Sequence, residues 1–288
     1  MKKFRRIWFV LVTAATLCFG GYQVFKYIKE DSSGPVISCS QETIQVSIED
    51  EESVLLKGVT AKDKKDGDVT DSILIEKLSG LYDGNKRTVT YAAFDSDNHI
   101  SKTEREVIYE DYTSPRFGLS GSLRFRAGEN VNIDQIVSAQ DCIDGNISNK
   151  VKIVMDTTIN NRVTGIYDIV YEVTNSAGDN AKLPVQVEIY DNNRNEVDIN
   201  LSQYLVYYEG EAINYKSYLK SIKSGTIESY FEGVESADGQ NGTISKNSVT
   251  VQSQVNENEP GVYPVYFYYE NYGTIYTQGT EVMYVVVQ

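Results

Sequence analysis

Two short acidic blocks contain the side chains best suited to binding an ion. Each block places three oxygen-bearing side chains within six residues, and together these are Asp63, Asp66, Asp68, Asp141, Asp144 and Asn146. Calcium prefers six or more hard oxygen ligands, so both blocks are candidate calcium sites. Neither is an EF-hand loop, because the glutamate expected at the twelfth position is missing. Calcium is the one cofactor that the sequence suggests.

A structural role for the same blocks competes with the calcium hypothesis. The first aspartate of each block can accept hydrogen bonds from loop amides, while the Asp-Gly pair makes a tight turn into the next strand. A more diverged copy of the block, residues 237–249, has Asn241-Gly242 where the second block has Asp144-Gly145. Because that copy keeps the turn residues without the acid, the sequence favours the turn interpretation.

Residues for catalysis are sparse. His99 is the only histidine, it lies in a polar stretch, and no Ser or Cys motif surrounds it. A histidine-based triad or a zinc site therefore has little support. Carboxylates are abundant, but in so acidic a chain scattered acids are usually a solvated face, and no glycosidase pair can be selected. The sequence predicts a protein that is not an enzyme.

A dense set of tyrosines near the C-terminus offers a candidate binding surface. Strand alternation over 263–269 places Tyr263, Val265, Phe267 and Tyr269 on one face and Pro264, Tyr266 and Tyr268 on the other. One face must be core, so Tyr266 and Tyr268 are candidate partner-binding residues that could stack on a glycan or anchor a protein. The alternative is that these tyrosines are ordinary strand residues in cross-strand packing.

The acidic block also reveals an internal repeat. The sequence of residues 61–73, AKDKKDGDVTDSI, recurs in altered form at residues 139–151 as AQDCIDGNISNKV. The strands that flank the two blocks match at a spacing of about 80 residues. Runs with period-two alternation, such as 88–94, 167–173 and 183–189, indicate strands buried on one side. Units of about 80 residues with short strands and Gly-Asn-Asp turns are typical of β-sandwiches.

These patterns predict an all-β fold, with three tandem Ig-like β-sandwich domains after one N-terminal transmembrane helix. The third domain is more diverged and contains an insertion between its early strands. The predicted segments are a cytoplasmic stub (1–6), a transmembrane signal-anchor helix (7–25), a linker (26–34), Ig-like domain 1 (35–111), Ig-like domain 2 (115–191) and a divergent Tyr-rich Ig-like domain 3 (196–288).

The order of these motifs resembles a known group of repeats. A Pro-hydrophobic opening, an A-x-D-x-x-D-G block, a G-x-Y-x-I-x-Y strand and an Asn-x-x-Gly turn are similar to the bacterial Ig-like repeats of Gram-positive surface proteins, in the HYR-like and group-three classes. The resemblance covers 35–191 well and 197–288 loosely. It implies a surface module for spacing, adhesion or presentation, without one fixed ligand.

The N-terminus has the pattern of a membrane anchor. Lys2, Lys3, Arg5 and Arg6 precede an uncharged, broadly apolar run over 7–25. Its 19 residues can just cross a bilayer as a helix, and the basic flank places the N-terminus inside. A cleaved signal peptide shares this pattern, and a lipoprotein signal at Cys18 is a further alternative, although Leu17 is a poor residue before a lipidated cysteine.

The net charge of the chain limits the kinds of molecule that it can bind. The whole chain carries a net charge of −14, and its first 26 residues hold five basic and no acidic side chains, which leaves −19 on the remainder. Such a surface repels the phosphates of nucleic acid, so no nucleic-acid partner is expected.

The sequence thus predicts a single-pass cell-membrane protein with a cytoplasmic N-terminus and extracellular Ig-like domains. Its expected role is adhesion, binding or spacing at the bacterial cell surface, with a protein or glycan as partner. The alternative is a non-catalytic accessory subunit of an envelope or membrane-associated assembly.

Overall fold

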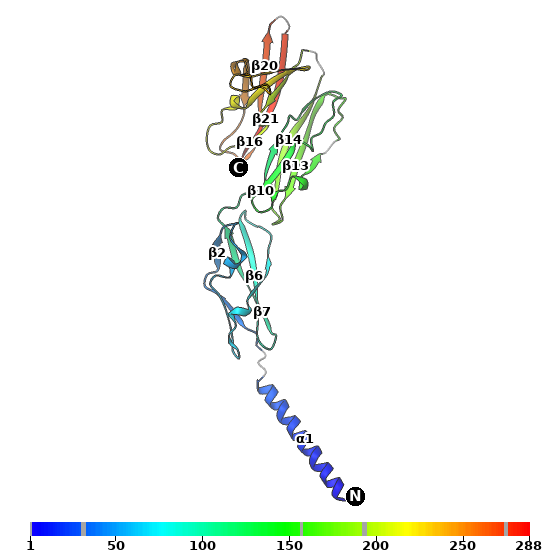
Figure 1. The fold of residues 1–288 in the computed structure, drawn as a ribbon, viewed down its shortest axis with the longest axis vertical. Coiled ribbons are helices and arrows are strands. Elements are labelled where there is room, and N and C mark those ends of the chain that lie inside the picture. Colours follow the sequence, from blue (N-terminus) through cyan, green and yellow to red (C-terminus); the bar gives the residue numbers. More distant parts are fainter. Residues whose placement is uncertain (1, 30–32, 156–157, 192–194, 274–275) are drawn as a thin grey trace. The chain divides into compact units, whose positions relative to one another are not determined.

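The structure is a computed structural model that describes residues 2–29, 33–155, 158–191, 195–273 and 276–288. It contains two compact units, Met1–Tyr112 and Thr113–Gln288. The first unit holds the N-terminal helix and one β-sandwich, and the second holds two further sandwiches (Figure 1). The predicted all-β fold with one N-terminal helix is therefore confirmed for the described residues.

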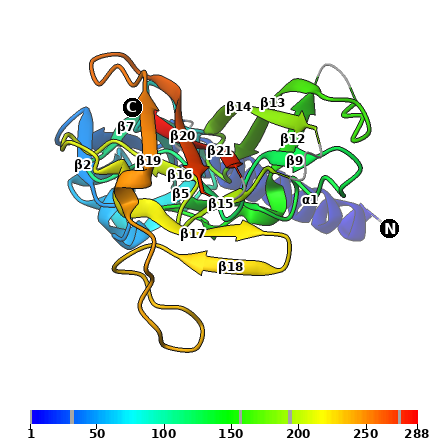
Figure 2. The same cartoon turned by 90° about the horizontal axis from the view of Figure 1, so that it is seen from above.

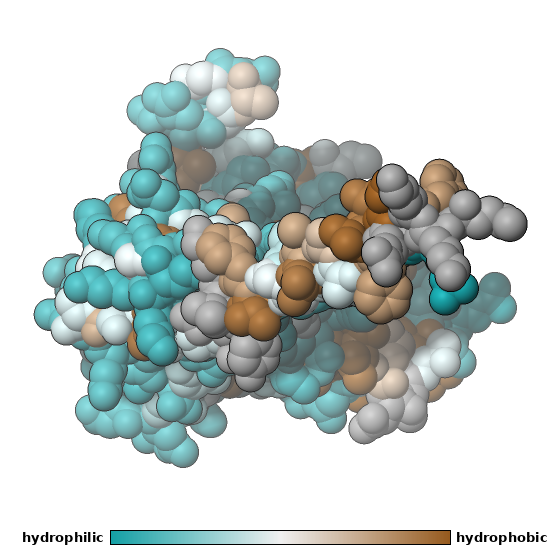
Figure 3. Space-filling model, turned by 90° about the horizontal axis from the view of Figure 1, so that it is seen from below, coloured by the Kyte–Doolittle hydropathy of each residue, from teal (hydrophilic) through white to brown (hydrophobic). Residues whose placement is uncertain are grey.

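The N-terminal helix, α1, extends over Lys2–Lys29, beyond both ends of the predicted span. Its segment Ile7–Lys26 is long and apolar enough to cross a membrane, and none of that window is buried in the structure. Apolar side chains, in brown and tan, dominate its described surface (Figure 3). A signal sequence has the same properties, so the anchor stays a prediction. The predicted linker, 26–34, includes residues 30–32, which lie outside the described residues.

The first sandwich combines a three-stranded and a four-stranded sheet. The smaller sheet has the order β1-β3-β4 and the larger β2-β7-β6-β5. Their strands are β1 (Val36–Cys39), β2 (Thr43–Val46), β3 (Val59–Asp63), β4 (Gly67–Asp68), β5 (Leu74–Leu78), β6 (Lys86–Phe94) and β7 (Ile100–Tyr109). Short 3-10 helices, η1 (Glu52–Leu56) and η2 (Thr70–Ser72), connect them. Only the β2–β7 pair of the larger sheet is parallel.

The second and third sandwiches repeat this topology within the described residues. Their smaller sheets are β8-β10-β11 and β15-β17-β18, and their larger sheets are β9-β14-β13-β12 and β16-β21-β20-β19. The second contains β8 (Arg116–Leu119), β9 (Arg124–Arg126), β10 (Val137–Asp141), β11 (Gly145–Asn146), η3 (Ser148–Lys150), β12 (Lys152–Met155), β13 (Gly165–Thr174) and β14 (Asn180–Tyr190). The third contains β15 (Asp198–Leu201), β16 (Leu205–Tyr207), η4 (Tyr215–Tyr218), β17 (Leu219–Ser224), β18 (Ile227–Tyr230), η5 (Lys246–Ser248), β19 (Val249–Ser253), β20 (Gly261–Tyr272) and β21 (Tyr276–Val287).

The third sandwich departs from the others in its smaller sheet. Strand β18 has four residues, whereas β4 and β11 at the equivalent positions have two each. Strands β17 and β18 form an antiparallel hairpin, drawn in yellow in Figure 2. The segment 231–245 follows it and, among β pairings, makes only isolated bridges before η5. The extra residues of the third repeat are therefore accommodated outside the four-stranded sheet.

Each core lies between its two sheets, as period-two alternation requires. In the first sandwich Val89 and Tyr91 face inward from β6, and the hydroxyl of Tyr91 donates to the carbonyl of Leu55 at 2.5 Å. Tyr171 repeats this bond to Ile133 at 2.8 Å in the second sandwich. A buried hydroxyl needs such a partner. At the equivalent position the third sandwich has Phe267, which carries no hydroxyl.

The second and third sandwiches share one continuous apolar cluster. The amide of Tyr204 in the third donates to the carbonyl of Leu119 in the second at 3.4 Å. The hydroxyl of Tyr207 accepts a hydrogen bond from the amide of Phe117 at 2.7 Å. Figure 1 shows β13 and β14 in green beside β20 and β21 in orange and red. This contact between two predicted repeats is called the joint below. Residues 192–194, between the two predicted domains, lie outside the described residues.

Candidate functional site

The second acidic block forms a hydrogen-bonded turn. The Asp141 carboxylate accepts from the amides of Ile143 and Asp144 at 2.9 and 2.8 Å. Asp144 accepts from the amide of Ser176 at 2.7 Å and from Lys150 at 2.8 Å. The lysine and serine lower the pKa of Asp144 to about 2, with Lys150 as the largest cause. These are the bonds that the turn interpretation requires.

Asn146 completes that turn, and Asp68 has the same role in the first block. The side-chain oxygen of Asn146 accepts from the amide of Ser148 at 3.0 Å. Asp68 accepts from the amide of Thr70 at 3.0 Å, and hydrogen bonds from Thr70 lower its pKa. Each side chain therefore bonds the amide of the first residue of the short 3-10 helix that leads into the next strand.

The first block repeats the turn with one difference. Asp63 accepts from the amides of Lys65 and Asp66 at 2.7 and 2.8 Å, and Asp66 accepts from the amide of Ser96 at 2.8 Å. The bond from Ser96 lowers the pKa of Asp66. The second carboxylate oxygen of Asp63 is buried without a hydrogen-bond partner.

The second oxygen of Asp63 lacks a hydrogen-bond donor because one residue differs between the two repeats. In the second repeat Asn175 donates its amide to the second oxygen of Asp141 at 3.0 Å. The first repeat has Asp95 at that position, and an ionised carboxylate cannot donate. Asp95 instead lies 2.8 Å from Nδ1 of His99. The signal in the sequence is the aligned pair Asp95 and Asn175, which differ in whether the side chain can donate.

Metal binding gains no support from the arrangement of these side chains. Across the described ranges, no group of three or more His, Cys, Asp or Glu residues is placed to hold a metal ion. The six candidate ligands are divided between two repeats, and most of their oxygens already accept hydrogen bonds from the loops. Calcium binding stays a hypothesis, as does the prediction that the protein is not an enzyme.

The tyrosine surface lies on the larger sheet of the third sandwich. Val265, Phe267 and Tyr269 are buried, whereas Tyr266 and Tyr268 between them are partly exposed on the outer face. The two outer rings stack with centroids 6.2 Å apart and planes 17° from parallel. The predicted alternation is therefore present, and a stacked aromatic pair occupies the outer face of β20.

That pair is specific to the third repeat. From the matched core residues Tyr91, Tyr171 and Phe267, the positions of Tyr266 and Tyr268 correspond to Thr90 and Ala92 in the first repeat, and to Val170 and Glu172 in the second. The sandwich fold therefore does not require tyrosine at either position. Cross-strand packing alone therefore does not explain why both positions are tyrosine in the third repeat.

A third tyrosine on this face belongs to the joint. Tyr284 lies on β21, on the same face as Val282, which pairs with Tyr266. Its ring is buried against the second sandwich, and its hydroxyl bonds both backbone groups of Gln186. Burial raises the pKa of Tyr284 to about 12. On the outer face of this sheet, Tyr284 is therefore covered by the second sandwich, whereas Tyr266 is partly exposed to solvent.

A groove runs along the joint at this boundary. One part, of about 400 Å³, is lined by Pro184, Gln186, Pro264 and Tyr284 among others, and a second part, of about 430 Å³, shares Pro184 and Val262 with it. Its lining is mostly apolar, with the Gln186 amide donating to Asp168 at 2.9 Å. An apolar groove with few polar groups beside an aromatic pair is typical of a binding surface.

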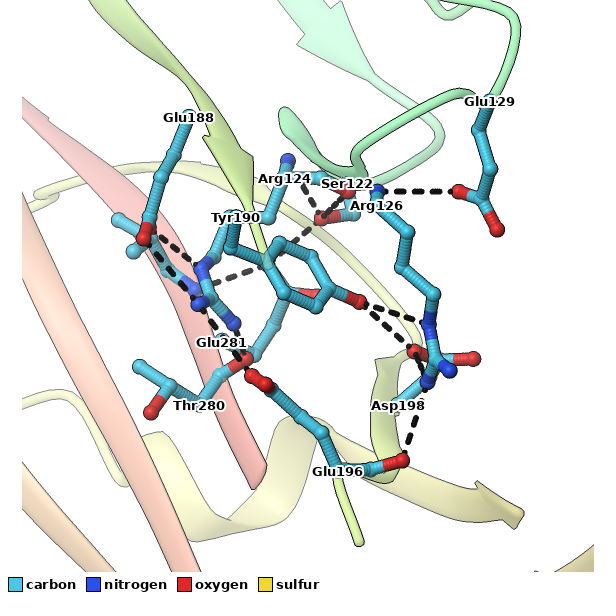
Figure 4. A network of polar contacts seen from close by, with 11 residues as sticks. Ser122, Arg124, Arg126, Glu129, Glu188, Tyr190, Glu196, Asp198, Thr280 and Glu281 are labelled. Carbon is cyan, nitrogen blue, oxygen red and sulfur yellow. Dashed lines mark hydrogen bonds and ion pairs between the residues drawn. The ribbon is translucent and has the colours of Figure 1, made fainter. Parts of the chain in front are cut away.

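A charged network also connects the two sandwiches (Figure 4). The Arg124 guanidinium donates to Glu188 at 2.6 Å and to the carbonyl oxygen of Thr280, and it lies 3.8 Å from Glu196. It also lies 4.6 Å from the centre of the Tyr190 ring, in cation–π geometry. One arginine from the second sandwich thereby contacts both β21 and the chain leading into β15.

Arg126 extends the network toward β15. It donates to Asp198 at 2.7 Å and to the Tyr190 hydroxyl at 3.1 Å, and that hydroxyl donates to Asp198 at 3.0 Å. Burial raises the pKa of Tyr190, so the hydroxyl stays a donor. The three groups satisfy one another across the two sandwiches, and this supports a fixed arrangement of the joint.

Glu281 is the most buried acid of this network. Its carboxylate accepts from Ser122 at 2.9 Å and from the amide of Val282 at 2.8 Å. Burial raises the pKa of Glu281 to about 7, although hydrogen bonds and the charge of Arg124 oppose the shift. Sequence reasoning missed it, yet the alternation of β21 gives a signal, because Glu281 falls on the same face as Met283 and Val285.

Comparisons with known proteins identify no family, since no family model matches the chain. An uncharacterized 81.3 kDa protein of Acholeplasma phage L2 is 25% identical over 168 residues, which are 55% of this chain and 22% of that protein. The chain therefore spans about a fifth of the curated relative it matches.

Similar solved structures include the CBM51-2 and INT domains of Clostridium perfringens ZmpB in complex with GlcNAc. That match has a TM-score of 0.22 and 17% identity, and it covers 55% of this chain and 42% of that one. Mouse cadherin-23 EC22-24 gives a TM-score of 0.20 and 12% identity, with 89% and 99% covered. Protocadherin GammaB4 gives 0.20 and 12%, with 89% and 50% covered. At these TM-scores the description of the fold depends on the sheets themselves.

Proposed function

We propose that this protein is an N-terminally anchored cell-surface protein of the bacterial Ig-like type, which binds a glycan or protein through the outer face of its third sandwich. The observation that carries the proposal is the stacked pair Tyr266 and Tyr268, which is absent from the same positions of the other two repeats. The first sandwich would act as a spacer between the membrane and the binding unit.

Physical chemistry favours binding at this pair. Two stacked tyrosines offer large apolar contact area, few rotatable bonds and two hydroxyl groups, and such rings are enriched at binding hot spots. The joint supports them, because Tyr284 and the Arg124 network fix the sheet against the second sandwich. A site on a rigid support loses less conformational entropy when a ligand binds.

The geometry of the surface suggests the kind of ligand. The aromatic pair is stacked, and the neighbouring groove is mostly apolar, with the side-chain amide of Gln186 and the carboxylate of Asp168 as polar groups. A sugar ring can stack its apolar face on tyrosine while its hydroxyls bond such groups, and a peptide with an aromatic or proline residue can occupy the same surface. Nucleic acid is disfavoured by the acidic charge of the chain.

A second candidate function is a non-catalytic accessory subunit of an envelope or membrane-associated assembly. The observation that favours it is strand β18, which forms one edge of the smaller sheet of the third sandwich and exposes 70% of Ile227. An edge strand with an exposed apolar side chain is suited to lateral pairing with another chain. A stoichiometric partner in a pull-down from solubilised membranes supports this role.

The binding proposal is tested by exchanging the tyrosine pair. We expect Tyr266→Ser combined with Tyr268→Ser to weaken binding to cells, or to a glycan or protein found by screening, by about tenfold or more, as loss of hot-spot side chains does. The matched control is Thr90→Ser with Ala92→Ser, at the same positions of the first repeat and away from the groove. Unchanged binding by the tyrosine variant, with an unchanged melting temperature, would refute the proposed site.

A further inference from the structure

The first sandwich exposes an apolar patch at one end of its larger sheet. The patch consists of Leu74, Phe94 and Ile100 on the outer face of β5, β6 and β7, together with Ala92, which is only 8% exposed. Leu74 pairs with Ala92, and Phe94 pairs with Ile100. Exposed fractions are 47% for Leu74, 46% for Phe94 and 66% for Ile100. Adjacent exposed side chains of this size are unusual on a chain that is otherwise strongly acidic.

The fold does not require apolar residues at these positions. The same register in the second repeat holds Lys152, Glu172, Thr174 and Asn180. In the third repeat it holds Thr250, Tyr268, Glu270 and Gln278. Apart from Tyr268 of the aromatic pair, the other repeats have polar side chains throughout. The patch is therefore a property of the first sandwich, whose sequence lies nearest to the helix.

Chain length places this patch close to the end of the helix. Gly34 lies against the β7 residues next to Ile100, since a Cβ added to it would lie 2.8 Å from Oγ of Ser101 and 3.4 Å from Cβ of His99. Helix α1 ends at Lys29, five residues before Gly34. Five residues of fully extended chain span at most about 18 Å. The patch is thus held within a short tether of the candidate membrane span, Ile7–Lys26.

We propose that this patch docks on the outer surface of the membrane that holds the helix, with Leu74, Phe94 and Ile100 inserted at the boundary between headgroups and acyl chains. The proposal rests on the membrane anchor of the proposed function. A short tether gives the patch a high effective concentration at the bilayer, so modest apolar contact suffices. Such docking fixes the orientation of the first sandwich on the membrane.

The charges around the patch are compatible with a zwitterionic lipid surface. Lys102, which also pairs with Ala92 across the sheet, forms an ion pair with Glu76. Asp97, in the turn between Phe94 and Ile100, forms an ion pair with Lys65. Paired charges at the border of an apolar patch add little net repulsion against neutral headgroups. Phosphatidylcholine is therefore the lipid with which the proposal is tested.

The experiment uses the full chain in phosphatidylcholine vesicles whose acyl chains are brominated near the headgroup, because bromine quenches indole fluorescence at contact. Trp8 is the only tryptophan of the chain, so Trp8→Phe removes its indole fluorescence. In that variant, Ile100→Trp then introduces a single tryptophan in the patch. Asn180→Trp, at the matched position of the second repeat, is the control. We expect Ile100→Trp to be blue-shifted and quenched several-fold more by brominated than by ordinary lipid, and Asn180→Trp to show neither effect.

Two results would overturn the docking proposal. In one, Ile100→Trp is quenched no more than Asn180→Trp. In the other, its emission is blue-shifted without bromine quenching, which means that a second copy or another protein surface covers the patch. Adding Leu74→Lys and Phe94→Thr, the residues of the second repeat, should abolish the quenching. Both side chains are about half exposed, so the melting temperature of this variant should stay unchanged.

The unmodified chain separates this proposal from the anchor on which it rests. Trp8 is the second residue of the candidate span, so its quenching by lipid brominated near the headgroup reports that the helix enters the bilayer. If Trp8 is quenched and Ile100→Trp is not, the anchor stands and docking is refuted. If Trp8 is not quenched, the anchor itself is refuted.

Discussion

The hydroxyl of Tyr284 bonds both backbone groups of Gln186. It accepts from the Gln186 amide at 2.9 Å and donates to the Gln186 carbonyl at 3.0 Å. Strand β9 pairs with β14 only at residues 188–190, so this edge of β14 is open at Gln186. The Tyr284 side chain of the third sandwich therefore makes the backbone hydrogen bonds that a neighbouring strand would make in the second sandwich. These bonds help to join the two repeats into one compact unit.

Removing that hydroxyl should weaken the second unit. Tyr284→Phe removes the hydroxyl that bonds the part-buried amide and carbonyl of Gln186, so we expect the free energy of unfolding to fall by about 0.5–1.5 kcal/mol. Chemical denaturation of the full chain measures it. Tyr266→Phe, on the same face but outside the joint, should change it little. Equal losses from the two variants would contradict the role assigned to Tyr284.

Glu281 should make the stability of the joint depend on pH. Its pKa is raised from 4.5 to about 7 in the folded protein, so the folded state holds the proton more strongly than the unfolded state. The contribution of Glu281 to stability is therefore greatest below about pH 4.5, declines as the pH rises to about 7, and is constant above.

Replacing Glu281 by its neutral isostere should remove this decline. We expect Glu281→Gln to raise the free energy of unfolding above pH 7 by an amount on the order of 1–3 kcal/mol, and to change it little near pH 4.5. Denaturation across pH 4–8 measures the difference. The control is Glu270→Gln, an exposed position on the paired strand, for which no pH-dependent gain is expected. A gain that is the same at every pH would contradict the raised pKa.

A reciprocal exchange tests the unpartnered oxygen of Asp63. Asp95→Asn supplies the amide donor that Asn175 provides in the second repeat, so we expect it to raise the melting temperature of the first unit by a few degrees. Asn175→Asp should lower that of the second unit, because it removes the bond to Asp141. Calorimetry of the full chain follows both transitions. Two changes of the same sign would contradict this account.

The same variants bear on the calcium hypothesis. If the free oxygen of Asp63 were a calcium ligand, millimolar calcium would raise the melting temperature of the unmodified first unit and have less effect on Asp95→Asn. We expect calcium to shift neither, since the hydrogen bonds of the two acidic blocks already account for their composition.

Local patterns in the sequence were sufficient to predict the sheets and the aromatic face. The repeated block at 61–73 and 139–151 predicts two similar sandwiches because its turn bonds lie within one loop or reach one neighbouring turn. Alternation places Tyr266 and Tyr268 outside and Phe267 inside because a strand turns successive side chains to opposite faces. These relationships involve residues close in sequence or related by the repeat, so the sequence alone determines them.

Only the tertiary structure decided which residues join the second and third sandwiches. Arg124 and Thr280 are 156 residues apart, and Gln186 and Tyr284 are 98 apart, so no periodic pattern relates them. The sequence shows that Glu281 is a polar residue among core-facing positions of its strand. It does not show that Ser122 is the hydrogen-bond partner of Glu281. Contacts between repeats depend on how two finished sandwiches pack, and that packing selects residues which neither repeat would need by itself.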